Sequence, residues 1–344
     1  MTELQEDLDR YPVADSGNLV SRVPVIDVST IIRDVTHEDA REAIDQIGLA
    51  CREWGFFQVV NHGVPLSLIE STWRETASFF HAPASVKDAI MRTRENPWGY
   101  YNNELTKNQR DKKEVFDYTT DGVDPIYAAE NRWPDLGPAF RETLRDYRDA
   151  VTALSHRLLE AFCLGLDLPP DFMAADFGPG HTGFIRLNYY PVRDPLEASE
   201  IDHQAVADLG VHHHTDAGAL TVLLQDDIGG LQVFKDGFWH DIPPVEGAFV
   251  INTGDMMQVW SNDIYQAAVH RVLPMEKTDR YSIPFFFNPA AGTRVDPLPS
   301  VVTDARPARY RTIDWSDFRG QRTDGDYADY GPEVQIAQYR INPD

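Results

Sequence analysis

The spacing of hydrophobic residues changes about halfway along the chain. Before residue 176, apolar side chains recur every three or four positions in three runs, the spacing of one face of an amphipathic helix. After Asp176, short apolar runs alternate with Gly, Asp, Asn and Pro, and many short strands at close spacing are typical of a β-sandwich or barrel. The pattern predicts a mainly β protein with flanking helices.

The three helical runs differ in how clearly they are bounded. The first is expected to begin near a capping Thr36 and to end at Gly55, and the second follows Pro65. The third is the clearest, because apolar residues step by three or four from Phe140 to Phe162 before Gly165 ends it.

Short apolar runs mark the expected strands. Two of them, VPVIDVS and FFQVVNHGV, lie in the N-terminal half at residues 23–29 and 56–64. The later runs are FIRLNYYP, LTVLLQD, LQVF, FWHDI, AFVINTG, MMQVW, AAVHRVL and YSIPFFFN. Residues 94–135 show no clean period and predict a long loop region, with room for short strands.

These patterns divide the chain into four consecutive parts. An N-terminal helix and strand region with its long loop spans residues 1–135, of which 1–22 are expected to form a loose leader. A long supporting helix occupies 136–175, the β core occupies 176–295, and a tail rich in Pro, Asp and Arg follows outside the barrel at 296–344. The length of 344 residues fits one large domain or two small ones.

Composition narrows the class of partner. The chain carries 31 Lys and Arg against 55 Asp and Glu, a formal net charge of −24 that repels nucleic-acid backbones and anionic lipids. We expect a small-molecule substrate and no nucleic-acid or membrane partner, and the oligomeric state stays open. Cys51 and Cys163 lie in apolar helical patterns and are expected to be buried, reduced thiols. Since MTELQEDLDR has no apolar stretch for a secretory signal, the cytoplasm is the expected compartment.

The candidate chemistry begins with His214, Asp216 and His270, a His-x-Asp pair followed after 53 residues by a second His. Alternate residues of a strand share a face, so His214 and Asp216 can point inward together while His270 comes from a distant strand. Two imidazoles and one carboxylate on one face of an octahedral metal leave three positions open, the pattern of non-haem Fe(II) oxygenases. Zinc accepts the same ligands, but no His-Glu-x-x-His motif is present to supply a general base.

Only one histidine of HHHTD has the spacing from Asp216 that a His-x-Asp metal-ligand pair requires. His214 stands two residues before Asp216, whereas His212 shares its strand parity and is expected to point inward beside the site, and His213 faces away. Five other histidines have no paired context and are interpreted as hydrogen-bonded or exposed: His62, His81, His181, His203 and His240.

A candidate anion clamp follows ten residues after His270, where Arg280 and Ser282 form an Arg-x-Ser motif. A fixed guanidinium and a hydroxyl suit the far carboxylate of a keto acid that also binds the metal. On the run FIRLNYYP, Asn188 and Tyr190 share a strand face and can lie beside them. The alternatives are a surface salt bridge for Arg280 and plain aromatic packing for Tyr190.

The candidate substrate pocket is less well defined. His212, Arg186 and Phe286 have the strand parity to line it, although Phe286 is equally suited to core packing. The aromatic residues of the 94–135 segment would suit a small, largely apolar or aromatic molecule, or would simply pack the segment onto the barrel: Trp98, Tyr100, Tyr101, Phe116 and Tyr118. An amino-acid-derived or peptide substrate stays open.

Together these motifs resemble a known family. HTDAGALTVLLQDDIGGLQVF, NTGDMMQVWSND, AAVHRVLP and RYSIPFFFNP are similar to the iron- and 2-oxoglutarate-dependent oxygenases of the isopenicillin N synthase and plant flavonoid dioxygenase type. IDVSTI, GFFQVVNHGVP and NYYP resemble further parts of that family, and the resemblance extends over about residues 23–290. One departure is Asn262-Asp263, where the family commonly has Asn-Gly in a turn.

The resemblance implies a distorted double-stranded β-helix, a cupin-like jelly-roll core with flanking helices. It implies that Fe(II) binds His214, Asp216 and His270, and that 2-oxoglutarate contacts Arg280, Ser282 and Tyr190, with Asn188 nearby. The implied enzyme consumes O2 and 2-oxoglutarate, releases succinate and CO2, and oxidises a small molecule of secondary metabolism. Hydroxylation is the default outcome, with desaturation and ring closure as options.

Two other hypotheses stay open, and one further expectation concerns access to the site. Iron oxidases of the isopenicillin N synthase kind use no keto acid, and in such an enzyme Arg280 and Ser282 would bind a substrate carboxylate. A non-catalytic, ligand-binding relative is the second alternative. Because an oxygenase must bind its reactants in order, a lid is expected, and residues 94–135 are the candidate.

Overall fold

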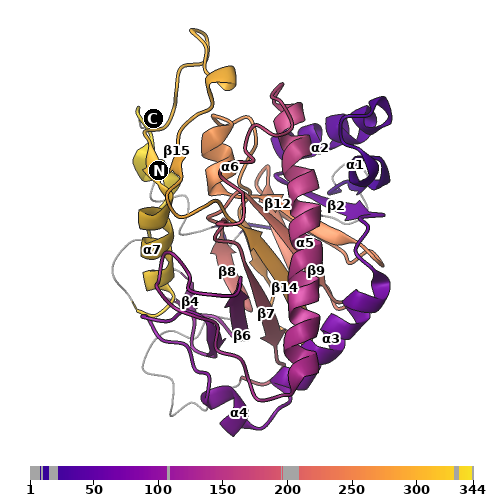
Figure 1. Ribbon diagram of the computed structural model, residues 1–344, viewed down its shortest axis with the longest axis vertical. Coiled ribbons are helices and arrows are strands. Elements are labelled where there is room, and N and C mark those ends of the chain that lie inside the picture. The colour runs from indigo at the N-terminus through magenta and orange to yellow at the C-terminus, as the bar shows by residue number, and fades with distance from the viewer. Residues whose placement is uncertain are drawn as a thin grey trace.

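The computed structural model of the chain describes residues 22–106, 109–194, 209–328 and 333–342, together with 8, 11–14 and 196. The expected leader at 1–22 falls largely outside the described residues, as does His203. Within them, two β-sheets pack face to face and helices cover the outer face of the larger sheet (Figure 1). The predicted jelly-roll core with flanking helices is confirmed.

The larger sheet has eight strands in the order β1-β2-β12-β9-β14-β7-β6-β3. Their bounds are β1 (Val25–Asp27), β2 (Phe56–Val60), β3 (Gly99–Tyr101), β6 (Glu114–Thr119), β7 (Phe184–Tyr190), β9 (Leu220–Gln225), β12 (Phe249–Thr253) and β14 (Arg280–Phe287). The first two strands are parallel, and each later pair in this order is antiparallel.

The smaller sheet is antiparallel, in the order β11-β10-β13-β8. Its strands are β8 (Val211–His214), β10 (Leu231–Lys235), β11 (Phe238–Asp241) and β13 (His270–Val272). Two short ladders join β4 (Leu105–Thr106) to β5 (Gln109–Arg110) and β15 (Arg294–Val295) to β16 (Ile313–Asp314).

Both faces of the larger sheet are covered. Between the sheets, a small apolar cluster joins Phe56, Leu223 and Val250 of the larger sheet to Leu231 and Val272 of the smaller one. The main hydrophobic core lies on the opposite face, beneath the helices. Strands such as β9 and β12 are therefore buried almost throughout and carry near-continuous apolar runs.

The helices are α1 (Ser29–Arg33), α2 (Arg41–Glu53), α3 (Leu66–Phe80), α4 (Ala84–Asp88), α5 (Pro138–Gly165), α6 (Asp255–Trp260) and α7 (Trp315–Gly325). The long predicted helix is confirmed as α5, which crosses the outer face of the sheet with α2 and α3 beside it (Figure 1). Gly55 ends the first predicted run at a φ of 63°, where a Cβ would lie 2.2 Å from the Gln266 carbonyl oxygen.

Two local predictions are wrong. Thr36 does not cap the first predicted helical run, which is α2. Its hydroxyl donates to Asp34, and a short 3-10 turn capped by His37 precedes α2. MMQVW is not a strand but most of α6, which begins after Gly254. Because nearly all of α6 is buried, the run has no polar face, and its period cannot distinguish a strand from a helix.

Residues 94–135 do not form a free loop. β3 and β6 extend the larger sheet at one edge, and β4 pairs with β5. Trp98, Tyr100, Phe116 and Tyr118 are buried in the hydrophobic clusters. These strands therefore belong to the folded core, and four of the five aromatic rings pack the segment onto the barrel, while its role as a lid stays a prediction.

The C-terminal segment is packed against the rest of the molecule. Tyr310, Ile313, Trp315 and Phe318 are buried in the main core. The Trp315 indole N–H donates to the Thr182 hydroxyl at 2.8 Å, which ties the start of α7 to the chain just before β7. The helix that follows is thus held at a fixed place beside the barrel.

The departure at Asn262-Asp263 has a structural reason. Both residues adopt positive φ angles, 53° and 65°, in the turn after α6. The Asp263 carboxylate accepts hydrogen bonds from Tyr310, Arg309 and Arg340 of the C-terminal segment. A glycine would satisfy the turn, but only a side-chain acceptor at this position can add these hydrogen bonds to the docking of the segment.

Cys51 and Cys163 are free and buried, as predicted. Across the described part of the chain, none of the helices combines the length and the apolar character needed to cross a bilayer.

Candidate functional site

Three metal-binding side chains converge at the smaller sheet. His214 ends β8, His270 begins β13, and the two are paired in register. Asp216 follows β8 and places its Oδ1 3.6 Å from the Nε2 atom of each histidine. The three potential ligand atoms lie within 4.8 Å of one another. Ligand atoms about 2 Å from a common ion lie about 3 to 4 Å apart, close to the 3.6 Å separations from Asp216, so the predicted trio fits one divalent cation.

Backbone carbonyls orient the two imidazoles. The Nδ1 of His214 lies 2.7 Å from the His212 carbonyl oxygen, and the Nδ1 of His270 lies 3.1 Å from the Ala268 carbonyl oxygen. Each Nδ1 therefore carries the proton, which leaves the Nε2 lone pair directed at the centre. Burial lowers the pKa of His214 well below its usual value, and the neighbouring His270 lowers it further, so the ring is neutral, as a metal ligand must be.

The carboxylate of Asp216 is fixed in a similar way. Its Oδ2 accepts hydrogen bonds from the Thr221 hydroxyl and from the Asn252 amide, and its Oδ1 faces the histidines. Burial acts to raise the pKa of Asp216, but His270, His214 and the two hydrogen bonds lower it overall. The group is ionised and has one oxygen left for a cation.

Two cavities meet at these residues, and His214 and Asp216 line both. The first, which we call the sheet cavity, lies between the two sheets, with His270 and Arg280 in its wall. The second, the tail cavity, is also lined by Arg319 and other residues of the C-terminal segment. A metal at the triad would be reached from two sides.

The sheet cavity contains a buried guanidinium with unused donors. Arg280 is 1% exposed, and its Nε and Nη1 have no hydrogen-bond partner among the described residues. Its guanidinium carbon lies 4.8 Å from the centre of the Tyr190 ring, which faces it across the β7–β14 pair. A buried cation with free donors is costly unless an anion joins it, so this position fits the carboxylate of a ligand.

The neighbours of Arg280 complete a polar cradle. Ser282 pairs in register with Asn188, whose amide donates to the Ser282 hydroxyl at 3.3 Å. The Oδ1 of Asn188 is buried without a partner among the described residues, and Tyr190 lines the same cavity. All four predicted co-substrate residues thus lie together, and Tyr190 also packs as an aromatic ring.

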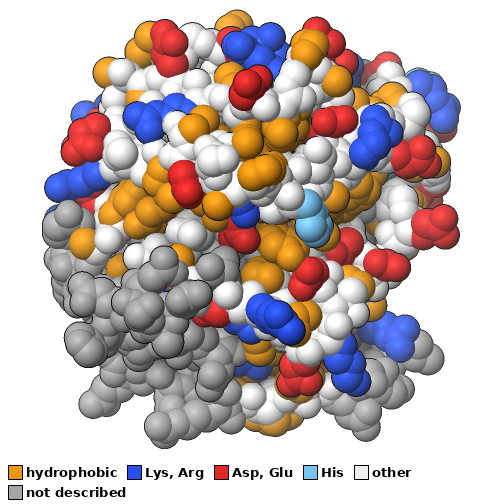
Figure 2. Space-filling model, turned by 90° about the horizontal axis from the view of Figure 1, so that it is seen from below, with side chains coloured by type: hydrophobic (Ala, Val, Ile, Leu, Met, Phe, Trp, Pro, Cys, Tyr) orange, Lys and Arg blue, Asp and Glu red, His pale blue; other side chains and the backbone are white. Residues whose placement is uncertain are grey.

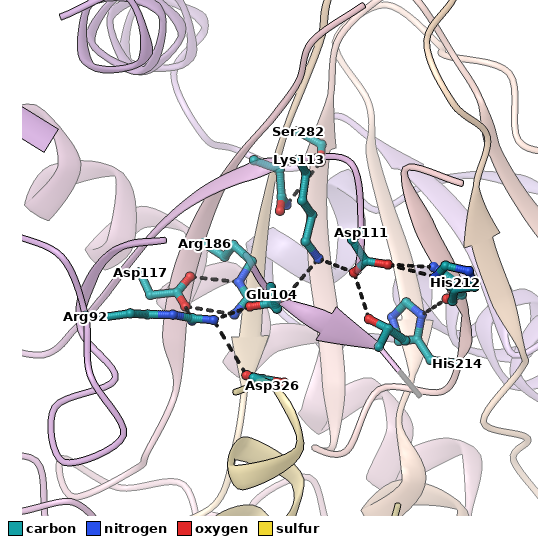
Figure 3. A network of polar contacts seen from close by, with 12 residues as sticks. Arg92, Glu104, Asp111, Lys113, Asp117, Arg186, His212, His214, Ser282 and Asp326 are labelled. Carbon is teal, nitrogen blue, oxygen red and sulfur yellow. Dashed lines mark hydrogen bonds and ion pairs between the residues drawn. The ribbon is translucent and has the colours of Figure 1, made fainter. Parts of the chain in front are cut away.

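A buried chain of alternating charges runs beside both cavities (Figure 3). Arg186 donates to Asp117 at 2.8 Å and to Glu104 at 2.6 Å, while Lys113 lies 2.7 Å from Glu104 and 3.0 Å from Asp111. Burial acts to raise the pKa of Glu104, but the surrounding cations hold it well below its usual value. Arg186 lines the cavities as predicted, although its donors are already engaged.

His212 does not line either cavity. Its Nδ1 lies 3.0 Å from Asp111 Oδ1, so the ring faces the charge network and not a substrate, which corrects the expectation for this residue. Phe286 does line both cavities. Of the five unpaired histidines, the four that the structure describes bond to backbone groups: His62, His81, His181 and His240.

Several residues of the site were missed from the sequence. Thr221 and Asn252 pair in register on β9 and β12, and the strand parity of AFVINTG would have placed Asn252 on the inner face. Lys113 lines both cavities, and Arg319 and Arg322 line the tail cavity. These three lie in segments without a clear strand pattern, so no parity rule could place them.

Comparison with known proteins agrees with this geometry. The family model described as 2OG-Fe(II) oxygenase superfamily matches residues 181–289. A second family model, described as the N-terminal region of the non-haem dioxygenase in morphine synthesis, matches residues 23–136. A 1-aminocyclopropane-1-carboxylate oxidase of Arabidopsis thaliana is 33% identical over 304 residues, 86% of this chain and 92% of that protein. A flavonol synthase/flavanone 3-hydroxylase of Eustoma exaltatum subsp. russellianum is 32% identical over 307 residues, 87% of this chain and 86% of that protein.

A solved structure is similar over nearly the whole chain. The crystal structure of JOX2 in complex with 2OG, Fe and JA superposes with a TM-score of 0.76 at 29% identity, covering 97% of this chain and 94% of that one. The chain belongs to the 2OG-Fe(II) oxygenase superfamily. It is a non-haem dioxygenase that uses Fe(II), 2-oxoglutarate and O2 and acts on a small molecule, and the predicted resemblance is confirmed.

Proposed function

We propose that His214, Asp216 and His270 bind the Fe(II), and that Arg280 with Ser282 binds the far carboxylate of 2-oxoglutarate. The observation that carries this assignment is a shared cavity, in which three convergent ligand atoms accompany a buried guanidinium with free donors. Asn188 and Tyr190 support the same carboxylate from the neighbouring strand. The keto acid then extends from Arg280 toward the triad, which fixes its orientation before any reaction.

When bound, the iron and the keto acid supply the activation of O2 that oxidises an unreactive C–H bond, with release of succinate and CO2. The chain prepares that chemistry. The two histidines keep Nε2 deprotonated, Asp216 keeps one oxygen free, and Leu223, Leu231 and Val272 give the sheet cavity an apolar wall that limits water. We propose hydroxylation of a secondary metabolite as the outcome, with desaturation and ring closure as options.

The sequence also allowed an iron oxidase that uses no keto acid, in which Arg280 and Ser282 would bind a carboxylate of the primary substrate. We do not retain it, because the relatives and the superposed structure indicate a 2-oxoglutarate-dependent enzyme. Stoichiometric release of succinate during turnover is the expected result, and turnover without succinate would contradict it.

A direct test is anaerobic addition of Fe(II) and then 2-oxoglutarate, followed by visible spectroscopy. We expect a weak metal-to-ligand charge-transfer band, which Arg280→Ala abolishes or weakens at least about tenfold in affinity, because a charge-assisted pair is lost. Arg294→Ala, an exposed arginine on β15, is the matched control and should leave the band unchanged. An iron-loaded protein without any band would contradict the co-substrate assignment.

We also propose a cytoplasmic enzyme without nucleic-acid or membrane partners. The net charge of −24 supports this, because it opposes approach to phosphate backbones and anionic lipids. On the face seen in Figure 2, basic side chains are scattered among acidic and hydrophobic ones and form no continuous stripe.

A further inference from the structure

The cationic side chains that line the tail cavity are of two kinds, those paired within the protein and those without a partner among the described residues. Arg186 and Lys113 belong to the buried charge network and are paired with carboxylates. Arg322 donates to the Thr215 carbonyl oxygen at 2.6 Å and forms an ion pair with Glu333 at 3.0 Å. Each of these three has its charge balanced by the protein and is not available to a ligand.

Arg319 differs from them. It lies half-buried on α7 and lines the tail cavity together with His214 and Asp216. It forms no hydrogen bond or ion pair with any residue that the structure describes, and its guanidinium carbon lies 4.8 Å from the centre of the Phe184 ring. The ring holds the planar group by a cation–π contact, and none of the described residues uses its N–H donors.

The acidic neighbours of Arg319 do not neutralise it. Asp124 and Asp326 interact with its charge, but neither forms an ion pair with it. The carboxylate of Asp124 is held by the backbone N–H groups of Ile126 and Tyr127. Burial and the neighbouring Glu104 raise the pKa of Asp326, and this carboxyl group lies 3.9 Å from the guanidinium of Arg92, its ion-pair partner.

Part of the wall of the tail cavity is apolar. Phe184 stacks on Phe286 with ring centres 4.7 Å apart, and Leu105 and Val211 lie in the same lining. Among the described residues, the tail cavity thus combines a guanidinium without a partner, an aromatic surface and two of the metal ligands. Arg280 already provides the keto acid with its own guanidinium in the other cavity.

We infer, on the basis of the proposed function, that the primary substrate is a small organic acid whose carboxylate binds Arg319. Its carbon body lies along Phe286, and the end away from the carboxylate faces the triad. This replaces the sequence-based expectation of a largely apolar molecule held by the aromatic residues of the 94–135 segment. In a protein with a net charge of −24, a free guanidinium at this place selects for an anion that the overall field would repel.

The test is a thermal-shift screen of the anaerobic enzyme loaded with Fe(II) and saturating 2-oxoglutarate, so that Arg280 is occupied. The library contains small aromatic and aliphatic carboxylic acids, each with its primary amide as the uncharged match. We expect acids to raise the melting temperature and their amides to have little effect. The dissociation constant of the best acid should increase about 10- to 100-fold in Arg319→Gln, because a charge-assisted contact is lost.

Two variants make the result specific. Arg319→Lys keeps the positive charge and should retain part of the affinity, while the exposed Arg294→Gln removes the same charge elsewhere and should bind like the parent. Amides that bind as well as acids, acids that bind Arg319→Gln unchanged, a library without any binding acid, or tighter binding of phosphonate analogues would each overturn the inference. A missing charge-transfer band would instead contradict the proposed function, so the two failures are distinguishable.

Discussion

At the scale of single residues, the site is defined by the atoms that the protein leaves without a partner. Each triad member uses one polar atom for an internal hydrogen bond and directs the other at the centre. Arg280 similarly keeps Nε and Nη1, in a buried place, without a hydrogen-bond partner among the residues that the structure describes. Such atoms are costly in an isolated protein, so their concentration in one cavity indicates ligands and not structural stabilisation.

The hydrogen bond from Thr221 to Asp216 gives a prediction at this scale. Thr221→Val keeps the shape of the side chain and removes the donor to Oδ2. The carboxylate then loses one of its two supports, and we expect the affinity for Fe(II) to fall about 10- to 100-fold, the usual effect of removing a group that orients a metal ligand. Anaerobic calorimetric titration with Fe(II) measures this directly.

Thr221→Ser is the matched control for that experiment, because it keeps the hydroxyl and removes only the methyl group. Its affinity for Fe(II) should stay near that of the parent enzyme. Equal losses in both variants would show that packing, and not the hydrogen bond, determines the effect, and would contradict the role given to Thr221.

At the scale of elements, one carboxylate adds several hydrogen bonds to the docking of the C-terminal segment. Asp263 combines a positive φ of 65° with hydrogen bonds from Tyr310, Arg309 and Arg340. We expect Asp263→Gly to destabilise the protein by about 2 kcal/mol, since glycine satisfies the turn but loses the charge-assisted bonds. Urea denaturation measures the stability, and limited proteolysis should detect earlier cleavage beyond residue 300.

The pH dependence of stability distinguishes the hydrogen bonds of the Asp263 carboxylate from the effect of its backbone conformation. Burial acts to raise the pKa of Asp263, but hydrogen bonds from Tyr310 and Arg309 lower it overall. A lowered folded-state pKa contributes stability above the unfolded value of about 3.9, and this contribution is lost as the pH falls through the folded value. The gap between the parent and Asp263→Gly should thus be full at pH 7 and narrow in acid. A gap that is independent of pH would mean that the glycine acts only on the backbone.

At the scale of the whole molecule, the sequence predicted the strand faces and helices that follow from the periodic spacing of residues within one segment. Strand parity correctly grouped Arg280 with Ser282 and Asn188 with Tyr190, and an apolar stripe located α5. Long-range packing was not accessible in the same way. Arg319 reaches the tail cavity through the docking of the C-terminal segment, to which Trp315 and Asp263 contribute, and no pattern within 296–344 encodes those contacts.

The position of the binding residues on both sheets links the stability of the whole fold to its ligands. Both sheets contribute residues to the sheet cavity, so a metal at the triad and an anion at Arg280 tie β8 and β13 to β7 and β14. A ligand at a hundred times its dissociation constant stabilises the folded state by about 2.7 kcal/mol. We therefore expect removal of the metal with a chelator to lower the melting temperature by a few degrees.

Added 2-oxoglutarate should raise the melting temperature clearly only when the metal is present, because the keto acid needs both anchors. In Arg280→Ala the metal-dependent rise should remain while the 2-oxoglutarate-dependent rise is lost, since that variant removes only the far anchor. Differential scanning calorimetry of the four combinations of metal and keto acid measures both steps. An equal response of Arg280→Ala and the parent to 2-oxoglutarate would place the keto acid elsewhere, and the free donors of Arg280 would then require another anion.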